Sequence, residues 1–184
     1  MLLLIRFWPS RAEAQTFRGS PPPDGISLPS FVLHDALGGG AVRSRDLRGD
    51  VVLVTFLDTR CEEACPIIAS QIARGLQLLE PDQRSTVTAL AISVDPQADT
   101  PARVRAFLRE RRADAIRYVS GSVAQLRPVW RAFHVLPAVD TGDADVHSAD
   151  VRVFDRDGTW VSTLHTGVDL TPANLAHDVV EALR

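Results

Sequence analysis

The sequence predicts an α/β sandwich built on a mixed β-sheet, and three observations lead to this prediction. Two runs, 50–58 and 86–94, are almost continuously apolar and rich in β-branched residues, which is typical of central strands buried on both faces. Segments whose apolar residues have helical spacing follow each run. Two later strands, 149–154 and 160–164, flank Asp155-Arg156-Asp157-Gly158, a hairpin signal. This order indicates helices packed against a sheet of parallel and antiparallel strands.

The first half of the chain supplies four further elements. Residues 30–35 alternate between apolar and polar, which predicts a short strand before the glycine turn at 38–40 and so an extra N-terminal hairpin. Apolar residues share one helical face over 67–79, which predicts the helix after the first buried strand. Thr100 followed by Pro101 predicts the capped start of another helix.

The second half is predicted to hold two more helices. Over 122–133 the apolar residues Leu126, Val129, Trp130 and Phe133 fall on one side. The closing helix is expected over 171–183, with Thr171 as its cap.

The length of 184 residues suits one domain preceded by a short tail. Residues 1–25 read either as a disordered tail and linker or as the remnant of a signal or membrane anchor, since Ala12-Glu13-Ala14 has the form of a signal-peptidase site. The Pro- and Gly-rich stretch before residue 26 supports a linker. The domain is therefore expected over 26–184.

Composition excludes several classes of function. Net charge is −3, which argues against a protein that binds nucleic acid by bulk electrostatics. All 20 basic residues are Arg, so chemistry through a Schiff-base or P-loop lysine is excluded.

Cys61 and Cys65 are the only cysteines of the chain. A bond between them would close a very short loop and add little stability, so the pair is expected to act chemically. Pro66 belongs in the first turn of a helix, which places both thiols at or just before a helix N-terminus. The N–H groups there favour thiolates, whereas the neighbouring acids Asp58, Glu62 and Glu63 oppose them. Such a spacing suits either a disulfide or a soft metal ion such as Cu(I) or Zn.

Two thiolates do not complete a metal site, so a third ligand must come from elsewhere in the chain. Of the five histidines, His147 stands out because it follows an acidic, Gly-containing loop and directly precedes a strand. Such a loop can fold back over the cysteine pair. A reactive pair that follows a buried strand and begins a helix is the thioredoxin arrangement. The predicted fold is therefore a thioredoxin-like sandwich with helices flanking a central mixed sheet.

Several motifs together resemble the Sco/SenC family of thioredoxin-fold copper proteins. They are Thr59-x-Cys61-x-x-x-Cys65-Pro66, then Ser93-Val94-Asp95-Pro96 with Asp99-Thr100-Pro101, and finally Val146-His147-Ser148 before a strand. The resemblance covers roughly residues 27–184 and implies that Cys61, Cys65 and His147 bind copper, as Cu(I) or Cu(II).

The resemblance also implies a function and a location. It implies a metallochaperone that helps to load or reduce the dinuclear copper site of cytochrome c oxidase subunit II, or a similar copper enzyme. Another periplasmic copper chaperone or a thioredoxin-like reductant is a further expected partner. Extracytoplasmic, periplasmic location with membrane association is expected.

Three other functions stay open at this point. A thiol–disulfide oxidoreductase would cycle Cys61 and Cys65 between dithiol and disulfide and would not need His147. A redox sensor would use the same two cysteines to switch a partner. A peroxidase ranks last, because Thr59 stands one residue too close to Cys61 for the usual T-x-x-C pattern. Outside the site, Asp95 is expected to make local turn hydrogen bonds.

Overall fold

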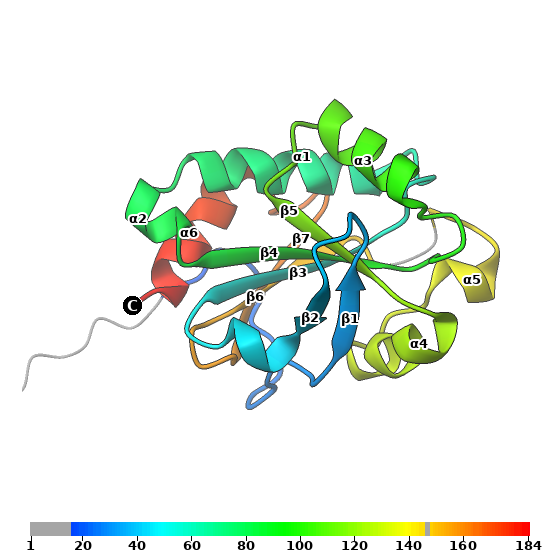
Figure 1. The fold of residues 1–184 in the computed structure, drawn as a ribbon. Coiled ribbons are helices and arrows are strands. Elements are labelled where there is room, and N and C mark those ends of the chain that lie inside the picture. The colour runs from blue at the N-terminus through cyan, green and yellow to red at the C-terminus, as the bar shows by residue number, and fades with distance from the viewer. Residues whose placement is uncertain (1–15, 146–147) are drawn as a thin grey trace, which may run out of the picture.

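A single seven-stranded sheet forms the centre of the computed structural model, which describes residues 16–145 and 148–184 (Figure 1). The strands lie in the order β2-β1-β5-β4-β3-β6-β7. β3, β4 and β5 run parallel, whereas β1, β2, β6 and β7 are joined by antiparallel pairing, so the sheet is mixed. Their bounds are Val32–Asp35 (β1), Ala41–Arg43 (β2), Val51–Leu57 (β3), Val87–Ser93 (β4), Ile116–Ser120 (β5), Asp150–Phe154 (β6) and Trp160–His165 (β7).

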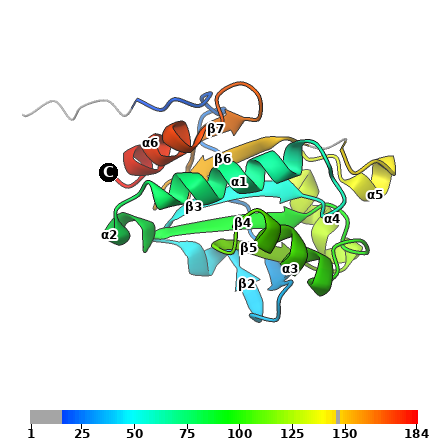
Figure 2. The same cartoon turned by 90° about the horizontal axis from the view of Figure 1, so that it is seen from above.

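Helices cover both faces of this sheet. One face carries α1 (Ala64–Gln77), α3 (Pro101–Glu110) and α6 (Pro172–Ala182), and Figure 2 looks onto this face, with α1 in front of the central strands. The opposite face carries α4 (Val123–Ala132) and the 3-10 turn η1 (Ser44–Leu47). Two single-turn helices, α2 (Pro81–Arg84) and α5 (Ala138–Thr141), complete the described elements. No helix within the described ranges is both long and apolar enough to cross a membrane.

β3 is the most deeply buried strand because all seven of its residues lie inside. Val51, Leu53 and Leu57 pack toward α1, α3 and α6, while Val52, Val54 and Phe56 pack toward α4. Thr55 is tolerated in this strand because its hydroxyl donates to the Asp150 carbonyl at 2.8 Å. A strand with two apolar faces therefore separates two cores and carries the cysteine segment at its end.

The predicted thioredoxin-like sandwich is confirmed, including the N-terminal hairpin of β1 and β2. The strand missed by the sequence analysis is β5, an interior strand between β1 and β4, and the short elements η1, α2 and α5 were not predicted either. The five residues of β5 include Arg117, which breaks the apolar run that identified β3 and β4. The guanidinium of Arg117 leaves the core by pairing with Asp35 at 3.0 Å. The predicted succession of two helices after β4 was therefore wrong, since β5 lies between them.

Residues 16–20 contact the domain, although sequence composition placed them in a linker. Ser20 pairs with Thr163 of β7 through two backbone hydrogen bonds of 2.8 and 3.0 Å. The backbone N–H groups of Arg18 and Gly19 donate to the fully buried carboxylate of Asp178 at 2.7 and 3.0 Å. Residues 1–15, which carry the signal-like motif, lie outside the described residues.

The Asp178→Ala substitution should lower the free energy of unfolding by about 2 kcal/mol. It removes the acceptor of Arg18 N–H and Gly19 N–H, and also of the Ser162 hydroxyl at 2.6 Å. Urea denaturation measures the loss, with Asp24→Ala at an exposed position as the control. Equal stability of the two variants would contradict this role of Asp178.

Candidate metal and thiol centre

The two cysteines flank the start of α1, directly after the end of β3. Cys61 precedes the helix and Cys65 lies in its first turn. The Cys65 backbone N–H donates to Cys61 Sγ at 3.2 Å, so the two residues face each other. Both side chains are buried, and within the described structure no disulfide joins them. The sequence therefore correctly predicted a thiol pair at a helix N-terminus.

The contact with Cys61, together with burial, decides the balance of effects on the Cys65 thiol. The hydrogen bond with Cys61 and the loss of solvent around the side chain raise the pKa of Cys65 well above its ordinary value. This outweighs the N–H groups at the start of α1, which favour the thiolate. The metal-free site thus holds Cys65 as a protonated thiol at neutral pH. Any ligand that needs the thiolate has to displace that proton.

Asp58, Arg60 and Asp95 form an ion cluster beside the thiols, here called the arginine clamp. Asp58 is fully buried and accepts from the Arg60 backbone N–H at 2.8 Å and from Arg60 Nη2 at 3.0 Å. The same Nη2 donates to Asp95 Oδ2 at 2.6 Å. The hydrogen bond to Asp58 raises the pKa of the guanidinium, which stays charged. The clamp ties the cysteine segment to the loop that follows β4.

Asp95 also makes the turn contacts that its sequence context predicted. Its Oδ1 accepts from the backbone N–H groups of Gln97 and Ala98 at 3.0 and 3.1 Å. The prediction was correct, and the salt bridge to Arg60 is an addition to it.

Asp99 lies behind the cysteine segment and is 4% exposed. Its carboxylate accepts from the Thr59 backbone N–H at 2.8 Å, the Ser93 hydroxyl at 2.6 Å and the Tyr118 hydroxyl at 2.7 Å. The Tyr118 hydroxyl also lies 2.9 Å from the Leu57 carbonyl at the end of β3, so its single hydrogen is shared between the two acceptors. Burial raises the pKa of Asp99 and, more strongly, the pKa of Tyr118. Asp99 therefore links β3, β4 and β5 beneath the cysteines.

Three contributors to this site were missed by sequence reasoning. Arg60 was assigned no role, although it stands between Asp58 and Glu62 beside Cys61, a pattern that favours an ion pair. Asp99 appeared only as part of a motif, because an Asp before a capped helix ordinarily makes local bonds. Tyr118 was missed together with its strand, β5.

The loop after α5 also reaches the cysteine segment. Asp145 Oδ1 accepts from the backbone N–H groups of Glu62 and Glu63 at 3.2 and 3.3 Å. His147, the predicted third ligand, lies outside the described residues. Among residues 16–145 and 148–184, no three His, Cys, Asp or Glu side chains gather closely enough to hold a metal ion. The pair of sulfur atoms is thus the part of the predicted ligand set that the structure describes.

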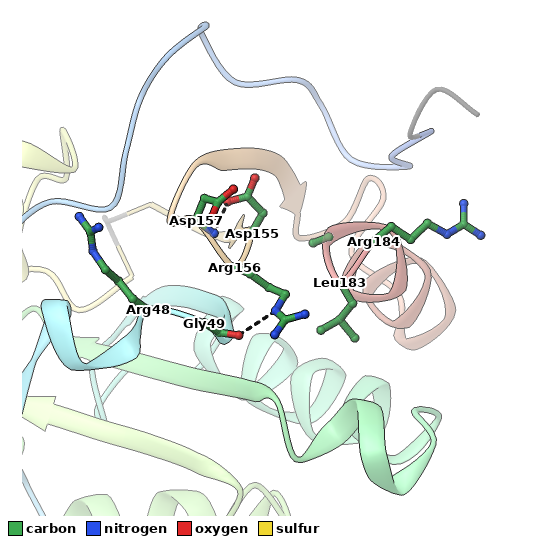
Figure 3. A pocket seen from close by; sticks show the side chains of 8 residues that line it. Arg48, Gly49, Asp155, Arg156, Asp157, Leu183 and Arg184 are labelled. Carbon is green, nitrogen blue, oxygen red and sulfur yellow. Dashed lines mark hydrogen bonds between the residues drawn. The ribbon is translucent and has the colours of Figure 1, made fainter. Parts of the chain in front are cut away.

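A hollow of about 500 Å³ opens beside Cys61, between the start of α1 and α3. A larger one, of about 620 Å³, lies at the opposite ends of the strands, where β3 begins, and is shown in Figure 3. There Arg156 Nε donates to the Gly49 carbonyl at 2.9 Å, and the ends of α6 and the β6–β7 turn form the walls. Its lining contains neither a thiol nor a histidine, so the hollow beside Cys61 is the one associated with the predicted chemistry.

The Arg60→Ala substitution should lower the free energy of unfolding by about 2 kcal/mol. The loss arises because Asp58 stays buried without its guanidinium partner. Thermal and urea denaturation measure it, and Arg105→Ala, an exposed arginine on α3, is the control. An Arg60→Ala variant as stable as this control would show that the clamp contributes nothing to stability.

Asp99 should impose a pH dependence on stability that the Asp99→Asn variant lacks. Because the folded pKa is raised, the contribution of Asp99 is fully present below the unfolded pKa of about 4 and is lost as pH rises through the folded value. Urea denaturation from pH 4 to 7 should show wild type losing stability relative to Asp99→Asn as pH rises. A difference that is constant over this range contradicts the assignment.

Comparison with known proteins places this site in context. A SCO2-like protein of Rickettsia typhi is 26% identical over 161 residues, which cover 84% of this chain and 75% of the relative. The structure of Bradyrhizobium japonicum ScoI with copper bound matches with a TM-score of 0.71 and 30% identity, over 86% of this chain and all of that one. The apo Sco1 protein from Thermus thermophilus matches with a TM-score of 0.68 and 25% identity, over 92% and 96% of the two chains. The SCO1/SenC family matches residues 23–184, and the chain, with its thiol pair after β3, belongs to that family.

Proposed function

We propose that this protein is a copper-binding metallochaperone whose cargo is held by Cys61 and Cys65. The observation that carries the proposal is the convergence of two buried cysteines at the start of α1, with Cys65 N–H on Cys61 Sγ at 3.2 Å. Thiolate sulfur is a soft ligand that selects Cu(I) over harder ions. Family membership supports this choice, as does the copper bound in the related ScoI.

The residues fit a copper ion by the chemistry of their donor atoms. Two thiolates provide a low-coordinate Cu(I) site, and an added imidazole makes Cu(II) acceptable. Burial shields Cys65, whereas Cys61 borders the hollow through which a partner reaches the site. The hydrogen bond from Cys65 N–H orients Cys61 Sγ, and the arginine clamp fixes the segment that carries it.

We include His147 as the third ligand. It follows Asp145 by two positions, and two residues of chain span at most about 7 Å. Asp145 itself contacts the backbone of Glu62 and Glu63, between the two cysteines. The chain at Asp145 therefore lies close enough to bring an imidazole to the sulfurs.

The proposed acceptor is the dinuclear copper site of cytochrome c oxidase subunit II or of a similar copper enzyme. We place the protein outside the cytoplasm, where another copper chaperone or a thioredoxin-like reductant supplies the cargo or the electrons. Copper and a Cys61–Cys65 disulfide exclude each other, because the metal needs both thiolates. Loading thus depends on the redox state of the pair.

A thiol–disulfide oxidoreductase is the second candidate, favoured by the same close approach of Cys65 N–H to Cys61 Sγ. In that reaction the two thiols give two electrons and two protons to a partner disulfide, and a Cys61–Cys65 bond forms while the partner bond breaks. The reaction requires no imidazole. A His147→Ala variant that keeps full activity in cells therefore favours this candidate.

Reduced, anaerobic wild-type protein should bind one copper ion per chain. Cys61→Ser and Cys65→Ser should abolish tight binding, because either change leaves a single thiolate. His147→Ala should retain Cu(I) but lose the thiolate-to-Cu(II) absorption of the wild type. Metal analysis and visible spectroscopy measure both effects, with His34→Ala, an exposed histidine in β1, as the matched control. Intact thiols without tight copper would overturn the proposal.

A further inference from the structure

We propose that the furrow between α1 and α3 docks an acidic, cysteine-bearing segment of the partner polypeptide. We call this furrow the arginine groove. It consists of two hollows, one beside Cys61 and one further along α1, whose charged lining residues are Arg60, Glu62, Arg74, Arg103, Glu110, Arg111 and Arg112. This inference deepens the proposed function, because it names the chemistry by which the partner is recognised.

The groove leads away from Cys61. Its first hollow, of about 500 Å³, is lined by Cys61 and Pro66 on one side and by α3 on the other. The second, of about 340 Å³, continues between the middle of α1 and the end of α3. Both hollows share Glu110 and Arg111. Figure 2 shows α1 and α3 on the same face of the sheet. A bound segment would thus extend along both helices with one end at Cys61.

Unmatched positive charge runs along this groove. Arg111 pairs with Glu110 at 3.0 Å, and Arg60 is held by Asp58 and Asp95 in the clamp.

The other three arginines, Arg74, Arg103 and Arg112, are exposed and form no ion pair with any residue that the structure describes. Only Glu62 remains as an unpaired acid among the charged residues of this lining. The groove therefore has three unpaired positive charges and one unpaired negative charge, whereas the whole chain has a net charge of −3. The local charge is opposite in sign to the net charge of the protein.

The wall of the groove is preformed. The Arg111 guanidinium lies 4.1 Å from the centre of the Phe107 ring and donates to the Phe107 carbonyl at 3.0 Å. Arg112 follows with a positive φ of 51°, a left-handed conformation that turns the chain away at the end of α3. These contacts fix the end of α3 that borders the groove before any segment binds, which lowers the entropic cost of docking.

A peptide segment suits this surface better than an anionic membrane. The unmatched arginines line hollows that accept side chains, whereas membrane-binding helices present a basic face beside a broad apolar one. Carboxylate side chains match the fork of a guanidinium in charge and geometry. Under the proposed function the partner must also bring a soft ligand for Cu(I) to Cys61, and a cysteine thiolate is such a ligand. An acidic segment next to such a cysteine satisfies both requirements.

The test measures reaction of the reduced, metal-free protein with three synthetic peptides. Each carries one cysteine as a mixed disulfide with thionitrobenzoate, flanked by four Glu, four Gln or four Arg residues. Cys61 thiolate attacks the peptide sulfur, the new Cys61–peptide disulfide forms, and thionitrobenzoate thiolate leaves with a measurable absorbance. The Glu peptide should react about tenfold faster than the Gln peptide at low salt, and the advantage should shrink as salt rises.

Variants locate the effect. Arg74→Glu with Arg103→Glu should remove the preference for the Glu peptide. The control variant, Arg105→Glu with Arg109→Glu, changes the net charge equally at exposed positions of α3 that line neither hollow. It should keep most of the preference for the Glu peptide. The groove proposal would be wrong if both double variants lost the preference for the Glu peptide equally, or if the Arg peptide reacted faster than the Glu peptide. Loss of binding to phosphatidylglycerol vesicles in the groove variant, with peptide rates unchanged, would assign the arginines to a membrane instead.

Copper analysis on the same proteins separates the two proposals. Both double variants should still bind one copper ion per chain, since none of the changed residues contributes a sulfur or imidazole ligand. If the wild-type protein prefers the Glu peptide but binds no copper, the proposed chaperone function is wrong and the groove proposal still holds. Normal copper binding without any peptide preference would defeat the groove alone.

Discussion

The buried carboxylate of Asp99 connects the cysteine segment to the sheet, and much of the site depends on it. Its three donors come from Thr59 before Cys61, Ser93 at the end of β4 and Tyr118 in β5. Parallel strands place their carboxyl ends at one edge, but they do not by themselves fix the loops that follow. A single acceptor shared by these groups does so, and it acts from inside the protein, where hydrogen bonds are not weakened by water.

A second constraint acts from the solvent side of the same segment. Arg60 joins fully buried Asp58 to Asp95, so the loops after β3 and β4 are linked both beneath and beside the cysteines. The clamp also compensates the charge of Asp58, which would otherwise disfavour a thiolate nearby. The cost of burying Asp58 is thus met by a partly exposed residue adjacent to Cys61. Stability of the loop and chemistry of the thiols are consequently coupled through Arg60.

Patterns of neighbouring residues in the sequence were enough to predict those parts of the structure that depend on neighbouring residues. The apolar run of β3, followed by Cys61, Cys65 and Pro66, was enough to predict a thiol pair at a helix start. Tyr118 was not predictable in the same way, because Arg117 interrupts its strand and is neutralised by Asp35, which is distant in sequence. Likewise, the Pro- and Gly-rich composition before residue 26 gave no indication that Asp178 accepts hydrogen bonds from Arg18 and Gly19. In both cases the structure depends on a hydrogen-bond or ion-pair partner that is distant in the sequence.

The charges around Cys61 differ in sign on its two sides, and this separation bears on how cargo and partner approach. Exposed Glu63 and Asp145, which meet at the Glu63 backbone N–H, give an acidic side toward the loop that precedes His147, whereas Glu62 borders the arginine groove. The arginine groove begins on the other side, toward α3. A copper cation is attracted to the first side, and an acidic polypeptide to the second. Under the proposed function and the proposed groove, the two attractions act on different sides of one thiol, so docking of a partner does not require the metal to leave first. Under the proposed function, Cys61, which borders the groove and accepts a hydrogen bond from Cys65 N–H, is therefore the sulfur that a docked partner meets first.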